Sequence, residues 1–210
     1  MRKILLFDMD GTLTDSMPVY NREIRRVLEE DGAEIPEDIV RLTAPMTVDE
    51  IFDTLLALGC KGDHASLLAR LDFRDAYAND VMLKPGVKEF LEKKKAEGCR
   101  LFVLTGSPHA CSAPCLRHNG ILPLFEHVYS TDDFGTGKHN PGIYIALCQL
   151  HGFNPNEVTF FDDNYSALLA AKRAGMEVIG VADECEAEDE DAIRAAADGF
   201  IAGFDELLQE

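Results

Sequence analysis

Short apolar segments that alternate with helical patterns constrain the fold of this chain more than any other feature. Each segment is four or five residues long and rich in aliphatic or aromatic side chains; they cover residues 3–7, 100–104, 127–131, 158–161, 177–181 and 199–202. Buried parallel strands have this nearly continuous apolar character. Strands that alternate with helices form a parallel sheet with helices on both faces. The sequence therefore predicts an α/β fold.

Helical patterns lie between these strands, and they cover residues 87–95, 141–151 and 166–173. A long stretch near the start breaks the alternation. Between residues 16 and 83 no strand is predicted, and the helical patterns there cover residues 19–30, 37–42, 48–58 and 64–79. We therefore expect an α/β core domain of residues 1–15 and 84–210, and a small all-helical cap domain of residues 16–83 inserted after the first strand.

The charge balance limits the classes of partner. The 210 residues include 38 Asp and Glu but only 20 Lys and Arg, a formal net charge of −18. Such a surface repels nucleic acid and anionic membranes, although a small phosphorylated metabolite can bind where a local pocket is positive. No apolar run is long enough for a membrane span, and the N-terminus lacks the features of a signal peptide.

The cysteines bear on the compartment in which the chain works. Six are spread along the sequence without a disulfide-rich spacing. In a chain of this length they are typical of reduced thiols, so a cytoplasmic protein is expected. The oligomeric state stays open, and a monomer is compatible with the sequence.

Polar side chains follow three of the predicted strands at the point where each strand ends. Asp8 and Asp10 follow the first strand, Thr105 ends the second, and the pair Asp162-Asp163 ends the fourth. The carboxyl ends of parallel strands meet at one edge of the sheet, where ligands bind. Carboxylates crowded there repel one another unless a cation lies among them, and oxygen ligands suit Mg²⁺. Lys138, just before a predicted helix, is a candidate to neutralise phosphate or carboxylate charge.

These residues resemble the motifs of a known family. The segment FDMDGTLTDS at residues 7–16, Thr105, Lys138 and Asp162-Asp163 are similar to the four motifs of the haloacid dehalogenase-like hydrolase superfamily. The resemblance is to its helical-cap branch, which includes phosphoglycolate phosphatase and β-phosphoglucomutase. It implies a Rossmann-like core with helices on both faces of the sheet. The predicted cap resembles the family only in position and helical character.

The resemblance also implies a role for each motif residue. Asp8 is the implied nucleophile, which attacks phosphorus and forms an aspartyl-phosphate. Asp10 is the implied general acid and base. Thr105 and the amide of Gly106 bind phosphate oxygens, and Lys138 offsets the charge of nucleophile and phosphate. The implied activity is that of a phosphohydrolase acting on a small phosphorylated metabolite.

Mg²⁺ is the cofactor that the resemblance implies. Its implied ligands are the carboxylates of Asp8 and Asp163, the carbonyl of Asp10, and Asp162 either directly or through water. The metal shields the approach of an anionic phosphate to an anionic carboxylate.

Two other functions stay open on the same fold. A sugar phosphomutase of the β-phosphoglucomutase type passes the phosphate to a sugar hydroxyl, and an inert binding protein has no turnover. Mutases of this branch carry a histidine in the first cap helix, where this chain has Tyr20. A tyrosine is not a cation near neutral pH, so hydrolysis is favoured.

The predicted cap carries arginines that have two interpretations. Arg22, Arg25, Arg26 and Arg41 either reach a substrate anion or form the salt-bridged, solvated face of amphipathic helices. By position alone, residues 43–47 are predicted to form a specificity loop.

Overall fold

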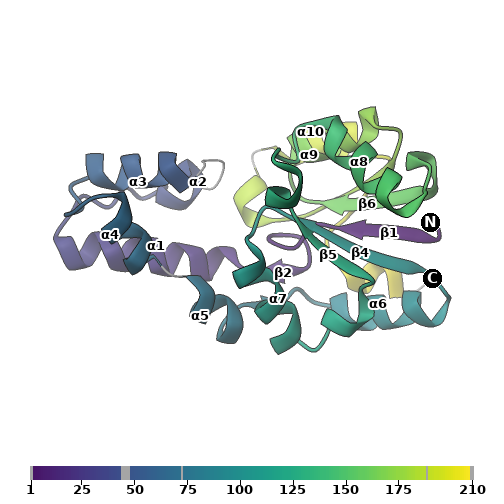
Figure 1. The fold of residues 1–210 in the computed structure, drawn as a ribbon, viewed down its shortest axis with the longest axis horizontal. Coiled ribbons are helices and arrows are strands. Elements are labelled where there is room, and N and C mark those ends of the chain that lie inside the picture. The colour runs from purple at the N-terminus through teal and green to yellow at the C-terminus, as the bar shows by residue number, and fades with distance from the viewer. Residues whose placement is uncertain (1, 44–47, 72, 188, 209–210) are drawn as a thin grey trace.

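The computed structural model describes residues 2–43, 48–71, 73–187 and 189–208, and its central element is a six-stranded parallel sheet (Figure 1). The strands are β1 (Ile4–Phe7), β4 (Arg100–Thr105), β5 (His127–Ser130), β6 (Val158–Asp162), β7 (Glu177–Val181) and β8 (Gly199–Ile201). All six were predicted, each to within one residue at either end. The α/β fold is therefore confirmed.

The order of the strands places β1 at the centre of the sheet. The order is β5-β4-β1-β6-β7-β8, so the chain runs outward from β1 first on one side and then on the other. Phe7, the last residue of β1, is paired with Val103 of β4 and with Phe161 of β6. The carboxyl ends of these three strands therefore meet at the switch point where α/β sheets bind ligands.

Helices cover both faces of this sheet (Figure 1). Leu5 and Phe7 of β1 belong to a core cluster with residues of α6 and α7, whereas Ile4 and Leu6 belong to a second cluster with residues of α8, α9 and α10. This alternation follows from the two-residue period of a strand. The bounds of these helices are α6 (Val87–Ala96), α7 (His109–His118), α8 (Pro141–His151), α9 (Tyr165–Arg173) and α10 (Glu190–Ala196).

The segment between β1 and α6 is mostly helical and extends away from the sheet (Figure 1). Its helices are α1 (Met17–Asp31), α2 (Ile39–Thr43), α3 (Val48–Ala57), α4 (His64–Arg70) and α5 (Phe73–Asn79). The first four share a small apolar core of their own, which includes Ile24, Phe52 and Leu67. The prediction of one helix over residues 64–79 is wrong, because the backbone of Leu71 (φ −92°, ψ 46°) leaves the helical conformation and ends α4.

The last helix of this segment packs against the α/β part of the chain. Ala76 and Tyr77 of α5 belong to the same apolar cluster as Cys111 and Cys115 of α7. This contact makes α5 a bridge between the helices α1–α4 and the sheet.

A two-stranded antiparallel sheet lies where the chain enters and leaves the helical segment. It pairs β2 (Thr14–Asp15) with β3 (Met82–Leu83). The expectation of no strand between residues 16 and 83 is therefore wrong, since β3 falls inside that range. Strands of two residues are too short to show an alternating pattern in the sequence. The proposed domain boundaries after residues 15 and 83 coincide with the ends of this pair and stay a prediction.

The remaining elements are short 3₁₀ helices: η1 (Leu122–Leu124), η2 (Thr131–Phe134), η3 (Pro155–Glu157), η4 (Glu184–Glu186) and η5 (Phe204–Leu208). All six cysteines lie in the described part of the chain and are free thiols. Over the described ranges, no helix has both the length and the apolar character that crossing a membrane requires.

Gly86 offers a test of the packing that starts α6. Its φ is +77°, and a Cβ there would lie 2.8 Å from the backbone Cα of Asp205. Gly98 has a similar φ of +81°, but a Cβ there meets nothing within 4 Å. We expect Gly98→Ala to lower the free energy of unfolding by about 1 kcal/mol through backbone strain alone. Gly86→Ala adds overpacking and should lower it by about 2–4 kcal/mol. Urea unfolding measures both, and equal losses would contradict the proposed steric origin.

Candidate active site

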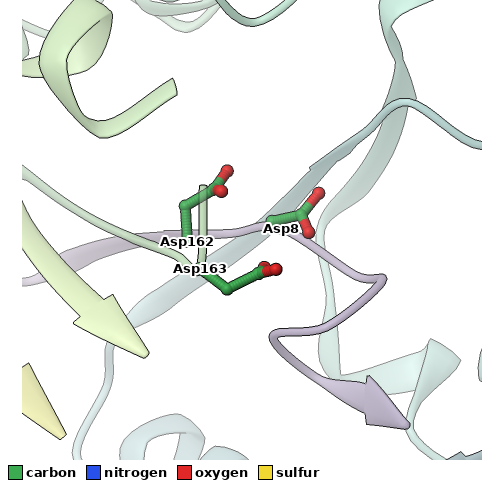
Figure 2. Close-up of side chains that lie close together, drawn as sticks. All are labelled: Asp8, Asp162 and Asp163. Carbon is green, nitrogen blue, oxygen red and sulfur yellow. The ribbon is translucent and has the colours of Figure 1, made fainter. Parts of the chain in front are cut away.

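Three buried carboxylates lie together at the carboxyl end of the sheet. Asp8 directly follows β1, Asp162 ends β6, and Asp163 comes next in the chain. One carboxylate oxygen from each lies within 4.8 Å of the others (Figure 2). The spacing and the oxygen donors fit a divalent cation. The predicted convergence of these three residues on one edge of the sheet is thus observed.

Lys138 supplies a positive charge at this cluster. Its Nζ lies 2.6 Å from Oδ1 of Asp8 and 2.7 Å from Oδ2 of Asp162. The hydroxyl of Tyr144 in α8 donates to the carbonyl of Lys138 at 2.9 Å and fixes the backbone there. Burial disfavours the charged ammonium, but the carboxylates of Asp162 and Asp8 outweigh this effect and hold the Lys138 pKa well above its usual value.

One lysine does not balance three carboxylates. Burial raises the pKa of Asp8 to about 8; Lys138 opposes the shift, and the charges of Asp162 and Asp10 add to it. Burial also raises the pKa of Asp163 well above its usual value, again helped by Asp162 and Asp8. Without a further cation the cluster therefore holds protons that ordinary carboxyl groups release. When these carboxyl groups are ionised, Lys138 leaves an excess of negative charge that a divalent metal would neutralise.

Neighbouring groups orient Asp162, which ends β6, and Asp163, which follows it. Thr12 Oγ1 donates to Oδ1 of Asp163 at 2.7 Å, and the amide of Asn164 donates to Oδ1 of Asp162 at 2.8 Å. Gly11 lets the carboxylate of Asp163 lie close to the backbone of the loop, because a Cβ on residue 11 would lie only 2.8 Å from Cγ of Asp163. The sequence placed Gly11 and Thr12 in the first motif but did not indicate that they contact Asp163.

The carboxylate of Asp10 lies apart from this cluster and has its own set of donors. It accepts hydrogen bonds from Tyr77 Oη at 2.8 Å, Ser107 Oγ at 2.7 Å and Thr105 Oγ1 at 3.2 Å. Met9, between the two aspartates, is buried in the apolar core. The structure therefore places Asp10 beside the predicted Thr105.

Tyr77 and Ser107 were not among the predicted site residues. The sequence contained a weak signal for Ser107, because it ends the Thr105-Gly106-Ser107 segment after β4. It contained none for Tyr77, which comes from α5 and is 67 positions from Asp10. Burial raises the pKa of Tyr77 well above its usual value, with the charge of Asp10 adding to the shift, so the phenol keeps its proton and remains a donor.

A cavity of about 410 Å³ opens onto these groups. Its lining includes the motif residues Asp8, Asp10, Gly106, Lys138 and Asp163. The helical segment supplies a mostly apolar part of the lining, which consists of Met17, Tyr20, Ile51, Phe73 and Tyr77. The cavity therefore lies between the motif residues and the predicted cap.

Three of the four arginines considered for substrate binding are engaged elsewhere. Arg22 pairs with Asp80 at 2.6 Å, and Arg26 pairs with Glu30 at 2.7 Å. Arg25 donates to the side chain of Asn21 at 2.7 Å. The side chain of Arg41, and residues 44–47 of the predicted specificity loop, lie outside the described part of the chain.

Known proteins with a similar sequence or fold belong to the family that the motifs resemble. A family model described as haloacid dehalogenase-like hydrolase matches residues 2–175. A phosphorylated carbohydrates phosphatase of Thermotoga maritima is 32% identical over 83% of this chain and 82% of its own length. A phosphoglycolate phosphatase of Haemophilus influenzae is 30% identical over 85% of each chain. A Thermotoga maritima structure, provisionally described as a β-phosphoglucomutase, superposes with a TM-score of 0.80 at 27% identity, over 99% of this chain and 98% of its own.

The raised pKa values predict how pH affects the metal-free protein. Asp8 and Asp163 bind protons more tightly in the folded state than unfolded, so stability should fall as pH rises from about 4 to about 8. A divalent metal needs the ionised carboxylates, so the melting temperature gained on adding it should grow over the same range. Differential scanning fluorimetry in chelator and in millimolar Mg²⁺ measures both trends.

Asp163→Asn tests the cause of these trends. It removes the charge but keeps an oxygen that accepts from Thr12. In chelator at pH 8 we expect this variant to have a higher melting temperature than the unsubstituted protein. We also expect Mg²⁺ to raise its melting temperature much less than it raises that of the unsubstituted protein. The matched control is Asp191→Asn at an exposed position of α10, which makes the same change in net charge. Equal behaviour of the two variants would show that the charge at residue 163 does not bind metal.

Proposed function

The chain belongs to the haloacid dehalogenase-like hydrolase family, and we propose that it is a magnesium-dependent phosphatase that hydrolyses a phosphate monoester of a small metabolite. The observation that carries the proposal is that two aspartates of one loop have different surroundings. Asp8 lies in the carboxylate cluster against Lys138, and Asp10 lies at the cavity with three hydrogen-bond donors. The first arrangement suits a nucleophile, and the second suits a group that exchanges a proton with the substrate.

In the proposed reaction, a carboxylate oxygen of Asp8 attacks phosphorus in line with the leaving oxygen and forms an aspartyl-phosphate. Asp10 gives a proton to the leaving oxygen as its bond to phosphorus breaks. Asp10 then takes a proton from the water that attacks the aspartyl-phosphate, which releases phosphate and restores Asp8. Thr105 and the amide of Gly106 bind phosphate oxygens, and Lys138 offsets the charge of nucleophile and phosphate.

The proposed metal is Mg²⁺, held by Asp8, Asp163 and the carbonyl of Asp10. It would reduce the repulsion between the anionic phosphate and the carboxylate of Asp8. Oδ2 of Asp162 contacts Lys138 and Oδ1 accepts from the amide of Asn164. Because both oxygens already have partners, we propose that Asp162 reaches the metal through water and chiefly positions Lys138.

A sugar phosphomutase is the second candidate, because the solved structure with a TM-score of 0.80 is provisionally described as a β-phosphoglucomutase. The cavity supports hydrolysis instead. Tyr20 occupies the position where such mutases carry a histidine, and none of the described residues that line the cavity is a histidine. Tyr20 stacks on Phe73, with ring centroids 5.4 Å apart. The donor that reaches Asp10 from the helical segment is Tyr77.

Asp8→Asn is the direct test of the nucleophile. The amide keeps the size of the side chain but lacks the negative charge that attacks phosphorus, so we expect phosphate release to fall by at least about a thousandfold. The measurement is colorimetric phosphate release with Mg²⁺ from sugar phosphates, phosphoglycolate and nucleotides. Circular dichroism should show an unchanged fold.

Two outcomes would contradict the proposal. Near-native phosphate release by purified Asp8→Asn would exclude Asp8 as nucleophile. Conversion of β-glucose 1-phosphate to glucose 6-phosphate without free phosphate, followed by phosphorus NMR, would favour the mutase.

Tyr77→Phe tests whether the hydrogen bond from α5 matters to Asp10. Phenylalanine keeps the ring in its apolar cluster and removes only the hydroxyl. A hydrogen bond to a charged group contributes about 1.5–3 kcal/mol, so we expect kcat to fall about tenfold or more with little change in KM. Tyr20→Phe is the matched control, because Tyr20 lines the same cavity but is not among the described donors to Asp10. Equal effects of the two substitutions would assign no special role to Tyr77.

A further inference from the structure

We propose that the leaving group of the substrate has an apolar face and carries no second anionic group. This inference rests on the proposed phosphatase function and narrows its substrate class. It excludes bisphosphates and phosphorylated acids as preferred substrates and favours uncharged or cationic apolar esters. Three features of the cavity carry it: the supply of positive charge, the carboxylates in the lining, and the apolar residues that the helical segment supplies.

Within the described lining of the cavity, positive charge comes from the motif residues alone. Lys138 is the only lysine or arginine among the described residues that line it. Its Nζ already contacts Asp8 at 2.6 Å and Asp162 at 2.7 Å. A second phosphate or a carboxylate on the leaving group would therefore meet no free cation from the described side chains. Binding such an anion would leave a desolvated charge without a partner.

The lining of the cavity carries negative charge beyond the motif residues. The loop after β7 brings Asp183 and Glu186 into the lining. Lys84 neutralises Asp183, with Nζ 2.7 Å from its Oδ2. For Glu186 no cationic partner occurs among the described residues; its Oε1 accepts from Asn164 Nδ2 at 3.3 Å. Glu186 therefore gives this side of the cavity a carboxylate that repels an anionic leaving group and attracts an ammonium group.

The part of the lining that the helical segment supplies is mostly apolar and can contact hydrocarbon. Tyr20 and Phe73 stack with an interplanar angle of 14°, and Tyr77 meets Phe73 edge to face with ring centroids 6.4 Å apart. Met17 and Ile51 extend the apolar surface. Such a wall gains free energy by burying an apolar leaving group, and aromatic rings also attract an organic cation.

The lining of this cavity predicts a substrate preference that differs from the one that the names of its relatives suggest. Phosphoglycolate, for which several relatives are named, carries a carboxylate beside its phosphate. In this cavity that carboxylate would meet a lining that holds apolar rings and Glu186. The fold is shared, but the charge of this lining predicts a different preference.

The test compares aryl phosphates that differ only in the para substituent. Phenyl phosphate is the uncharged reference, 4-carboxyphenyl phosphate adds an anion, and 4-(aminomethyl)phenyl phosphate adds a cation of similar size. We expect kcat/KM for the carboxylate to be at least about tenfold below the reference, and for the amine to equal or exceed it. Steric exclusion would instead lower both substituted esters.

A matched pair of variants assigns the effect to Glu186. Glu186→Gln should raise the ratio of kcat/KM for the 4-carboxyphenyl ester to that for the phenyl ester by at least about threefold. Glu184→Gln makes the same change in net charge in the same 3₁₀ helix, but Glu184 is exposed and outside the cavity lining, so the ratio should not change. An equal change in both variants would contradict the role of Glu186.

The outcomes distinguish this inference from the function on which it rests. Hydrolysis of 4-carboxyphenyl phosphate or 2-phosphoglycolate as fast as phenyl phosphate would overturn the substrate class and leave the phosphatase intact. Failure to release phosphate from any of these esters in the presence of Mg²⁺ would overturn the proposed function and the inference with it.

Discussion

Repulsion among three buried carboxylates at the end of β1 and β6 is the constraint on which the site depends. Asp8, Asp162 and Asp163 lie within 4.8 Å of one another, and Lys138 provides one positive charge among them. Burial and mutual repulsion raise the pKa values of Asp8 and Asp163. Such an arrangement costs free energy in the folded protein, and a bound cation would recover it. The site thus gives up stability for a group of carboxylates whose spacing fits a divalent cation.

The sheet can hold this arrangement because β1 is its central strand. Its neighbours β4 and β6 belong to opposite halves of the chain, and their ends supply Thr105 and the Asp162-Asp163 pair. Apolar side chains on both faces of β1 anchor the loop that follows, with Phe7 stacked on Phe161 at 4.9 Å between ring centroids. A rigid strand end of this kind positions a side chain more accurately than a free loop does.

The helical segment contributes to the site in two ways that differ in kind. Tyr77 donates a hydrogen bond to Asp10 from a helix that packs in the core of the α/β part, so the position of Asp10 depends on both parts of the chain. Tyr20 and Phe73 instead form an apolar surface that faces the cavity. The first contact concerns the proton that Asp10 is proposed to exchange, and the second concerns the group that leaves.

The sequence by itself determined the six strands and the acids at their ends, because a buried parallel strand is a local apolar run and its carboxyl end is where the run stops. Asp8 and Lys138 could be named in the same way, since each lies in a local motif. The contacts of Tyr77 and Glu186 were decided only by the tertiary structure. Tyr77 is 67 positions from Asp10, and Glu186 is 22 positions from Asn164. No local periodicity encodes such distances, because packing between elements sets them.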